Sequence, residues 1–153
     1  MANFEEFQRI SRAYSDASIM MHQAIAHRAG LSATDHKYLG LLMQKEKMTA
    51  GEIGEITGLT TGAVTGLIDR LEKMKLVTRA SDEADRRKVL IVPNTEKALE
   101  LLKPLFSDLQ KKTHALIETF TDQEVDTIKR YFESATNIMT TVTQNLKNNP
   151  SQT

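Results

Sequence analysis

The stretch TAGEIGEITGLTTGAVTGLIDRLEKMKLVTRASDEADRRKVLIV, residues 49–92, decides the fold of this 153-residue chain. It opens with Thr49 and Glu52, whose spacing is that of a capping box at the start of a helix. Apolar residues then recur at helical spacing: Ile53, Ile56 and Leu59. Because Gly58 is typical of a helix end, this part predicts a short helix that stops at a glycine.

A second helix is expected directly after this glycine. Either Thr60 or Thr61 can cap it. Its inward face repeats by three and four residues: Ala63 or Val64, Leu67, Ile68 and Leu71. Two helices joined by a short turn that contains glycine form the helix-turn-helix signature.

The hydrophobic period changes from helical to alternating after Leu76. Val77 and Arg79 lead into a polar run, residues 81–88, and a β-branched run follows at residues 89–92. This pattern predicts an antiparallel hairpin with a charged tip. Helix, turn, helix and basic hairpin in this order predict a winged helix-turn-helix.

The outward face of the second predicted helix consists mainly of small residues: Thr61, Gly62, Thr65, Gly66 and Asp69. A helix can read the DNA major groove only if its outward residues allow a close approach, and threonine offers both a hydroxyl and a methyl group to base edges. The helix N-terminus also favours phosphate. The competing interpretation is that the two glycines are tolerated on a solvated face, at a cost of about 1 kcal/mol each.

The predicted hairpin tip carries Asp85, Arg86, Arg87 and Lys88. In an extended segment residues i and i+2 share a side, so Asp85 can hydrogen-bond and orient Arg87. An oriented guanidinium suits a narrow minor groove or a phosphate clamp, whereas the alternative is an ordinary solvated tip. We therefore predict double-stranded DNA as a partner.

Residues 58–98, GLTTGAVTGLIDRLEKMKLVTRASDEADRRKVLIVPNTEKA, resemble the MarR-type winged-helix transcription regulators. The resemblance implies a homodimer that binds a pseudo-palindromic operator, with the helical flanks as dimerisation arms. It puts Asp85 and Arg87 at the family's wing pair. It puts Arg70 at the recognition-helix arginine, which is associated with the DNA backbone or with holding the wing.

The predicted DNA-binding site combines the capping threonine, the second helix and the hairpin tip: Thr60, Thr61, Gly62, Ala63, Thr65, Gly66, Arg70, Asp85, Arg86, Arg87 and Lys88. Three departures from the family pattern stand out. Gly66 replaces a residue that is often basic, so one phosphate or base contact is missing. Lys75 replaces a glycine, so a non-glycine must adopt any left-handed cap there. Residues 93–98 replace the usual Leu-Thr-x-x-Gly, although Asn94 or Thr95 can still cap the next helix.

The flanks on both sides of this unit read as helices. Helical spacing from Phe4 onward predicts a first helix of some 25 residues that ends near Gly30. Ser32 and Asp35 mark the start of a second helix. Because the first helix is too long to bury its apolar residues against a winged helix alone, it lacks a partner within the chain.

Two more helices are expected beyond the hairpin. The first runs from Thr95 to Phe120, and Pro104 should kink it. Thr121 and Glu124 then form a second capping box. A seam with spacings of three and four follows: Val125, Ile128, Phe132, Ala135, Met139, Val142 and Leu146. We predict that the N- and C-terminal helices of two chains interlock.

The expected architecture is thus mainly α with a small β-hairpin wing, in one domain that spans residues 1–153. Residues 33–93 form the winged-helix DNA-binding unit, and residues 1–30 and 95–146 form the dimerisation helices.

Composition narrows the function classes. The chain has 20 basic and 20 acidic residues, and a small positive excess falls on residues 60–92, which hold 7 basic and 5 acidic residues. The absence of cysteine excludes a thiol redox switch. With no signal peptide and no long apolar run, we expect a cytoplasmic protein without a membrane partner.

No enzyme motif is present, and neither a cofactor nor a metal site is predicted. The four histidines raise the alternative of a metal-responsive regulator, but His22 and His27 are five residues apart, which is a poor ligand spacing on a helix. The remaining alternative is a winged helix that contacts protein instead of DNA.

By topology and family analogy, a ligand wedged between the arms and the winged helix would change the spacing of the two reading heads. This predicts a repressor released by a phenol or an aromatic acid. The candidate pocket residues are Tyr14, His22, Tyr38 and Met43, for each of which core packing is the competing role.

Overall fold

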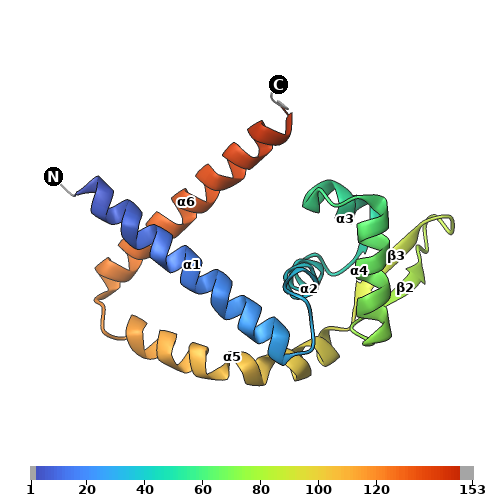
Figure 1. The fold of residues 1–153 in the computed structure, drawn as a ribbon, viewed down its shortest axis with the longest axis horizontal. Coiled ribbons are helices and arrows are strands. Elements are labelled where there is room, and N and C mark those ends of the chain that lie inside the picture. Colours follow the sequence, from blue (N-terminus) through green and yellow to red (C-terminus); the bar gives the residue numbers. More distant parts are fainter. Residues whose placement is uncertain (1–2, 149–153) are drawn as a thin grey trace. The chain divides into compact units, whose positions relative to one another are not determined.

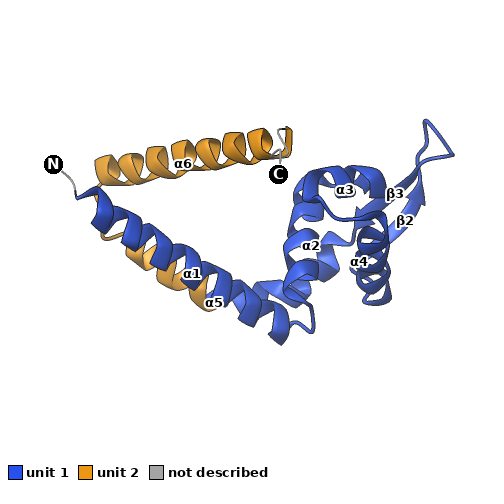
Figure 2. Ribbon diagram, turned by 45° about the horizontal axis from the view of Figure 1, so that its top comes forward, with its two compact units in different colours: residues 1–107 blue, residues 108–153 orange. Residues whose placement is uncertain are grey.

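The structure, a computed structural model, describes residues 3–148. Its elements, in chain order, are α1 (Phe4–Arg28), α2 (Ala33–Lys45), β1 (Met48–Thr49), α3 (Ala50–Thr57), α4 (Thr61–Lys73), β2 (Val77–Ser81), β3 (Val89–Pro93), α5 (Thr95–Ile117) and α6 (Asp122–Asn148). Figure 1 shows these elements along the chain. They fall into two compact units, residues 1–107 and residues 108–153, coloured separately in Figure 2.

Side-chain caps set the helix boundaries in the first unit. The Thr49 side chain accepts a hydrogen bond from the Glu52 amide, and the Glu52 carboxylate accepts one from the Thr49 amide, so the predicted capping box is confirmed. Gly58 ends α3 at a φ of 73°. Of the two threonines that could cap α4, Thr60 does so by accepting a hydrogen bond from the Ala63 amide.

The predicted hairpin is part of a three-stranded sheet with the strand order β1-β3-β2. Strands β2 and β3 pair antiparallel, from Val77 opposite Pro93 to Ser81 opposite Val89. The additional strand β1 places Met48 opposite Ile91. Sequence reasoning missed β1 because two residues are too few to show an alternating pattern.

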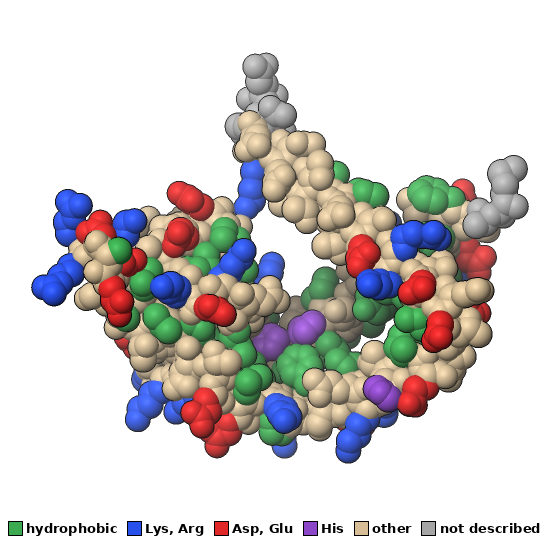
Figure 3. Space-filling view, turned by 180° about the vertical axis from the view of Figure 1, so that it is seen from behind, with side chains coloured by type: hydrophobic (Ala, Val, Ile, Leu, Met, Phe, Trp, Pro, Cys, Tyr) green, Lys and Arg blue, Asp and Glu red, His purple; other side chains and the backbone are tan. Residues whose placement is uncertain are grey.

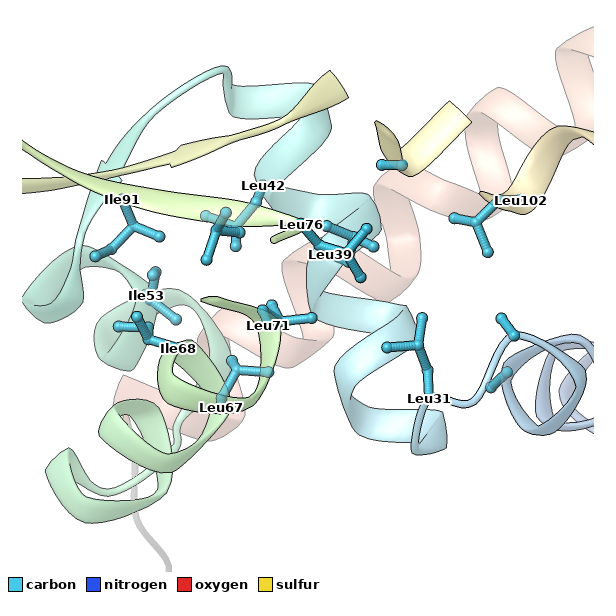
Figure 4. Packing of buried hydrophobic residues seen from close by; sticks show 14 of the residues in the cluster. Leu31, Leu39, Leu42, Ile53, Leu67, Ile68, Leu71, Leu76, Ile91 and Leu102 are labelled. Carbon is cyan, nitrogen blue, oxygen red and sulfur yellow. The ribbon is translucent and has the colours of Figure 1, made fainter. Parts of the chain in front are cut away.

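The core of the first unit lies between α2, α3, α4 and the sheet (Figure 4). The buried face of α4 contains Val64 and not Ala63, which is exposed. The expected stripe on α3 is only partly buried, because Ile53 is in the core while Ile56 is 46% exposed. The largest fully buried side chains are Leu39, Leu42, Ile53, Leu67, Ile68, Leu71, Leu76, Ile91, Val64 and Val77.

The two flanking helices of the first unit reach this core at one end each. Helix α1 contributes Ile25 and Ala26. Helix α5 contributes Ala98 and Leu102 near its start, where Asn94 caps it by accepting a hydrogen bond from the Lys97 amide.

Helix α5 continues through Pro104 but stops earlier than predicted, at Ile117 rather than Phe120. The capping box of Thr121 and Glu124 is present and starts α6 at Asp122. The chain therefore needs a turn at residues 118–120, and this turn shortens α5.

In the second unit, α6 has no buried residue. Large apolar side chains of its predicted seam are exposed: Phe132, Met139, Val142 and Leu146. Among the described residues we find no helix with the length and hydrophobicity that crossing a membrane requires.

Candidate nucleic-acid interface

The outward surface of α4 is built from the small residues that the sequence indicated. Thr61, Gly62, Ala63 and Thr65 are exposed, and Gly66 is half-buried. The Thr65 hydroxyl donates its proton to the carbonyl of Thr61 over 3.0 Å. Because that proton is used within the helix, the exposed Thr65 side chain offers its hydroxyl oxygen as an acceptor, together with its methyl group.

Arg70, at the end of this surface, is held by a carboxylate from α2. Arg70 Nε donates to Asp35 Oδ2 over 2.9 Å, and Arg70 Nη2 donates to Asp35 Oδ1 over 2.7 Å. The Asp35 side chain is only 5% exposed, whereas that of Arg70 is 56% exposed. The hydrogen bonds from Arg70 to Asp35 raise the pKa of the Arg70 guanidinium, which therefore stays charged.

A different arginine joins α4 to the hairpin. Arg79 of β2 donates one hydrogen bond to Asp69 Oδ1 over 2.5 Å and another to the Glu72 carboxylate, both on α4. Hydrogen bonding to Asp69, together with the charges of both carboxylates, raises the pKa of Arg79. The hydrogen bonds between α4 and β2 thus come from Arg79, whereas Arg70, for which the family resemblance left holding the wing as one of two roles, bonds to Asp35 of α2.

Two aspartates, Asp82 and Asp85, shape the hairpin loop between β2 and β3. Asp82 Oδ1 accepts hydrogen bonds from the amides of Ala84 and Asp85, at 2.7 and 3.3 Å. These two hydrogen bonds are the main reason why the pKa of Asp82 is lowered. The backbone closes the loop with hydrogen bonds from the Asp82 amide to the Lys88 carbonyl and from the Lys88 amide to the Asp85 carbonyl.

Asp85 in turn holds Arg87, as the sequence predicted. Asp85 Oδ1 accepts hydrogen bonds from both the Arg87 amide and Arg87 Nε, each at 3.1 Å. The pair lies in a turn and not in the extended segment that we expected, and the turn adds the bond to the amide. The Arg87 side chain is 92% exposed, so its terminal amino groups face solvent.

Arg86 and Lys88 are also exposed on this loop. Figure 3 shows Lys and Arg side chains, with acidic ones among them, at the outer end of β2 and β3. A helix surface of small residues beside a hairpin tip with an oriented arginine can insert the helix into a major groove while the tip contacts phosphate or the minor groove.

The candidate pocket residues differ in burial and in the residues that they contact. The ring of His22 lies near those of His36 and Phe106, with centroids 5.5 and 5.8 Å away. Tyr38 and Met43 are half-buried against the core. Tyr14 is 63% exposed. Within residues 3–148, no group of three or more His, Cys, Asp or Glu side chains is arranged to hold a metal ion.

Comparison with known proteins identifies the family. Residues 29–88 match the sequence profile described as the MarR family. The chain is 40% identical over 139 residues to the uncharacterised HTH-type transcriptional regulator YcgE of Bacillus subtilis (strain 168), covering 91% of this chain and 90% of YcgE. This chain belongs to the MarR family.

MarR-family members of known structure share the fold of this chain. A MarR family protein from Bacillus stearothermophilus has a TM-score of 0.70 and 22% identity, covering 90% of this chain and 95% of the other. A mutant of MarR from E. coli, solved in complex with operator DNA, has a TM-score of 0.52 and 20% identity, covering 88% of this chain and 99% of the other.

The MarR assignment makes this chain a DNA-binding transcriptional regulator with a winged helix-turn-helix, and not an enzyme. The predicted mainly helical fold with a small hairpin wing is confirmed.

Several residues that shape the candidate interface of this MarR-family chain were not singled out from the sequence. Asp35 was read only as part of a helix start, and Asp82 only as part of a polar run. Glu72 and Arg79 were not considered as a pair. The contacts of Asp35, Glu72 and Arg79 join residues that are 7 to 35 positions apart in the chain, and periodicity gives no signal for such pairs. The contacts of Asp82 span only two and three residues, and the signal for them is the tendency of aspartate to accept hydrogen bonds from the amides that follow it in a turn.

Proposed function

We propose that this MarR-family protein is a repressor that binds a pseudo-palindromic operator as a homodimer and is released by a small aromatic effector. The observation that carries DNA contact by the wing is Arg87, held at Nε by Asp85 and otherwise exposed. A guanidinium that is already oriented loses little freedom when it meets a phosphate or a narrow minor groove. A dimer bound within a promoter excludes the polymerase, and such a protein acts in the cytoplasm.

The apolar surfaces of α1 and α6 support the homodimer. Large exposed side chains occur along both helices: Phe4, Phe7, Ile10, Ile19 and Met20 on α1, and Phe132, Ile138, Met139, Val142 and Leu146 on α6. Apolar surface of this extent marks an interaction site in a folded protein. A second copy would also hold two α4 helices at a fixed separation, which for successive major-groove faces is about 34 Å.

The test of DNA binding is Arg87→Ala, measured by fluorescence anisotropy on a duplex that the wild-type protein selects from a randomised pool. We expect a loss of affinity on all sequences and a salt slope lower by about one unit, because one phosphate contact is lost. Lys111→Ala removes a cation from an exposed position of α5 and serves as the control. Unchanged affinity and slope for Arg87→Ala would remove Arg87 from the interface.

The effector is proposed to bind near His22, where rings from α1, α2 and α5 meet. His36 and Phe106 are nearly parallel, with an interplanar angle of 18° and centroids 6.1 Å apart. Imidazole can hydrogen-bond a hydroxyl or carboxylate while neighbouring rings contact an aromatic body. Phenol and benzoate should therefore weaken binding of the wild-type protein to its selected duplex. If His22→Ala responds to both compounds like the wild type, the site lies elsewhere.

A further inference from the structure

Of the carboxylates that form ion pairs in the first unit, Asp35 is the most buried, and it joins α2 to Arg70 of α4. Asp35 and His36 are the only buried polar residues among those that the structure describes, and the Asp35 carboxylate binds Arg70 with both oxygens. A fork of two parallel hydrogen bonds fixes the plane of a guanidinium and not merely its position. Asp35 therefore determines where the rest of the Arg70 guanidinium points.

The bonds to Asp35 use one side of the guanidinium, Nε and Nη2. The remaining nitrogen, Nη1, lies over Gly66, one helical turn earlier on the outward face of α4. A Cβ atom at position 66 would be 3.2 Å from Arg70 Nη1. This is tighter than most contacts that real Cβ atoms make, so with a Cβ at position 66 the end of the Arg70 side chain would have to shift by a few tenths of an ångström.

The Arg70 guanidinium thus lies where a side chain at position 66 would begin. A basic residue at position 66 would carry its own charge to the DNA. Here the neighbouring arginine lies over that place, and its side chain is 56% exposed. Nη1 has two N–H groups, and a phosphate oxygen can accept from them at the surface of α4.

We propose that Asp35 is a positioning residue for DNA binding: it holds the Arg70 guanidinium so that Nη1, lying over Gly66, donates to a backbone phosphate. This inference rests on the proposed DNA-binding function and assigns the helix's own phosphate contact to three residues. Since Asp35 offsets the charge of Arg70, the contact depends on the direction of the hydrogen bond more than on long-range attraction.

The experiment is a double-mutant cycle of Asp35→Asn and Arg70→Lys, with affinity measured by anisotropy on the duplex selected by the wild-type protein. Asn cannot accept the two-bond fork, and Lys keeps the charge that Asp35 needs but has no fork and no Nη1. We expect each single variant to bind about tenfold more weakly, the scale of one charge-assisted hydrogen bond. The double variant should also be about tenfold weaker, and not a hundredfold, because both changes remove the same contact.

Gly66→Ala tests the space under the guanidinium. It should weaken binding several-fold in the wild-type background and have no further effect in the Arg70→Lys background. Gly40→Ala, on α2, where an added Cβ would meet nothing within 4 Å, is the matched control for the gain in helix propensity. Thermal melts of all variants identify any that lose affinity by unfolding.

Three results would overturn the proposal: additive losses in the cycle, tighter binding by Asp35→Asn, or wild-type affinity for Gly66→Ala. The first would mean that Asp35 acts independently of Arg70, and the second that its carboxylate competes with phosphate. If the wild-type protein selects no duplex, the proposed function itself fails. If it binds and Arg87→Ala weakens binding, but the cycle shows no coupling, only the role of Asp35 is wrong.

Discussion

Two single residues outside the interface adopt backbone conformations that usually belong to glycine. Lys75, which follows α4, has a φ of 60°, as its place in the family pattern predicted. Glu46, which follows α2, has a φ of 63° and a ψ of −39°. There the Lys47 amide donates to the Lys45 carbonyl over 2.8 Å, the hydrogen bond of a γ-turn. For a residue with a Cβ such conformations cost about 1–2 kcal/mol, so both positions store strain.

Lys75→Gly should stabilise the protein. It removes strain of about 1–2 kcal/mol and adds about 0.5–1 kcal/mol of chain entropy to the unfolded state, so we expect a gain of about 0.5 kcal/mol in the free energy of unfolding. Urea denaturation measures this change. Lys73→Gly, two residues earlier within α4, should instead lose about 1 kcal/mol. If both variants lose stability equally, Lys75 carries no strain in solution.

At the scale of elements, three helices of the first unit meet at a cluster of rings. His22 of α1, His36 of α2 and Phe106 of α5 lie within 6.1 Å of one another, centroid to centroid. His36 is buried there, and burial, followed by the nearby charge of His22, lowers its pKa from 6.5. The packing of these helices therefore favours a neutral His36.

This packing predicts that stability falls on mild acidification. In the range below 6.5 the unfolded chain binds a proton at position 36 more readily than the folded chain, so the stabilisation is present above that value and is lost as the pH falls through the lowered pKa. Melting temperatures between about pH 7.5 and about pH 5 measure the loss, which should be smaller in His36→Gln.

The same substitution at His27, which is exposed on α1, is the control. The carboxylates Glu52 and Glu124 do not interfere, because hydrogen bonds from the capping threonines lower their pKa values below 4.5. If His36→Gln shows the full wild-type loss, another group titrates in this range.

The elements themselves could be predicted largely from the sequence, because local chemistry sets them. Both capping boxes, the glycine after α3 and the switch in period after Leu76 involve residues within a few positions of one another. What could not be predicted depends on distant parts of the chain. Strand β1 exists only because Met48 meets Ile91, and the end of α5 depends on where the next helix starts.

The candidate site shows the same limit. The bond between Asp85 and Arg87 spans two residues and could be predicted, although the turn that contains it could not. The partner of Arg70 lies 35 residues away on another helix, and the rings around His22 come from three helices. No periodicity or spacing reports such contacts, which only the packed fold brings together.

At the scale of the whole molecule, the seam of α6 is an apolar surface whose large side chains Phe132, Met139, Val142 and Leu146 are exposed among the residues that the structure describes. Its spacing of three and four residues over several turns is that of helices packed side by side. Buried against a second chain, Met139 of each protomer would contribute about 1.5–3 kcal/mol to the free energy of dimerisation. The proposed homodimer therefore depends on this surface.

Met139→Glu should weaken dimerisation by at least about a hundredfold, since two copies of the substitution face one interface and each costs about 1.5–3 kcal/mol. Sedimentation equilibrium measures the dissociation constant. Asn137→Glu adds the same charge to the opposite side of α6 and should leave it unchanged. Equal effects of the two substitutions would indicate that α6 does not form the contact.

The carboxylates of Asp82 and Asp85 give the hairpin loop its shape before any duplex is present. Ordering one flexible backbone residue costs about 1–2 kcal/mol, so a loop that had to fold on contact would lose much of the energy that its cations gain from phosphate. In this loop the conformational entropy is lost once, when the protein folds, and not at each encounter with DNA. In the proposed DNA contact, the wing would therefore bind and leave DNA repeatedly, as a search along a chromosome demands, without being reordered each time.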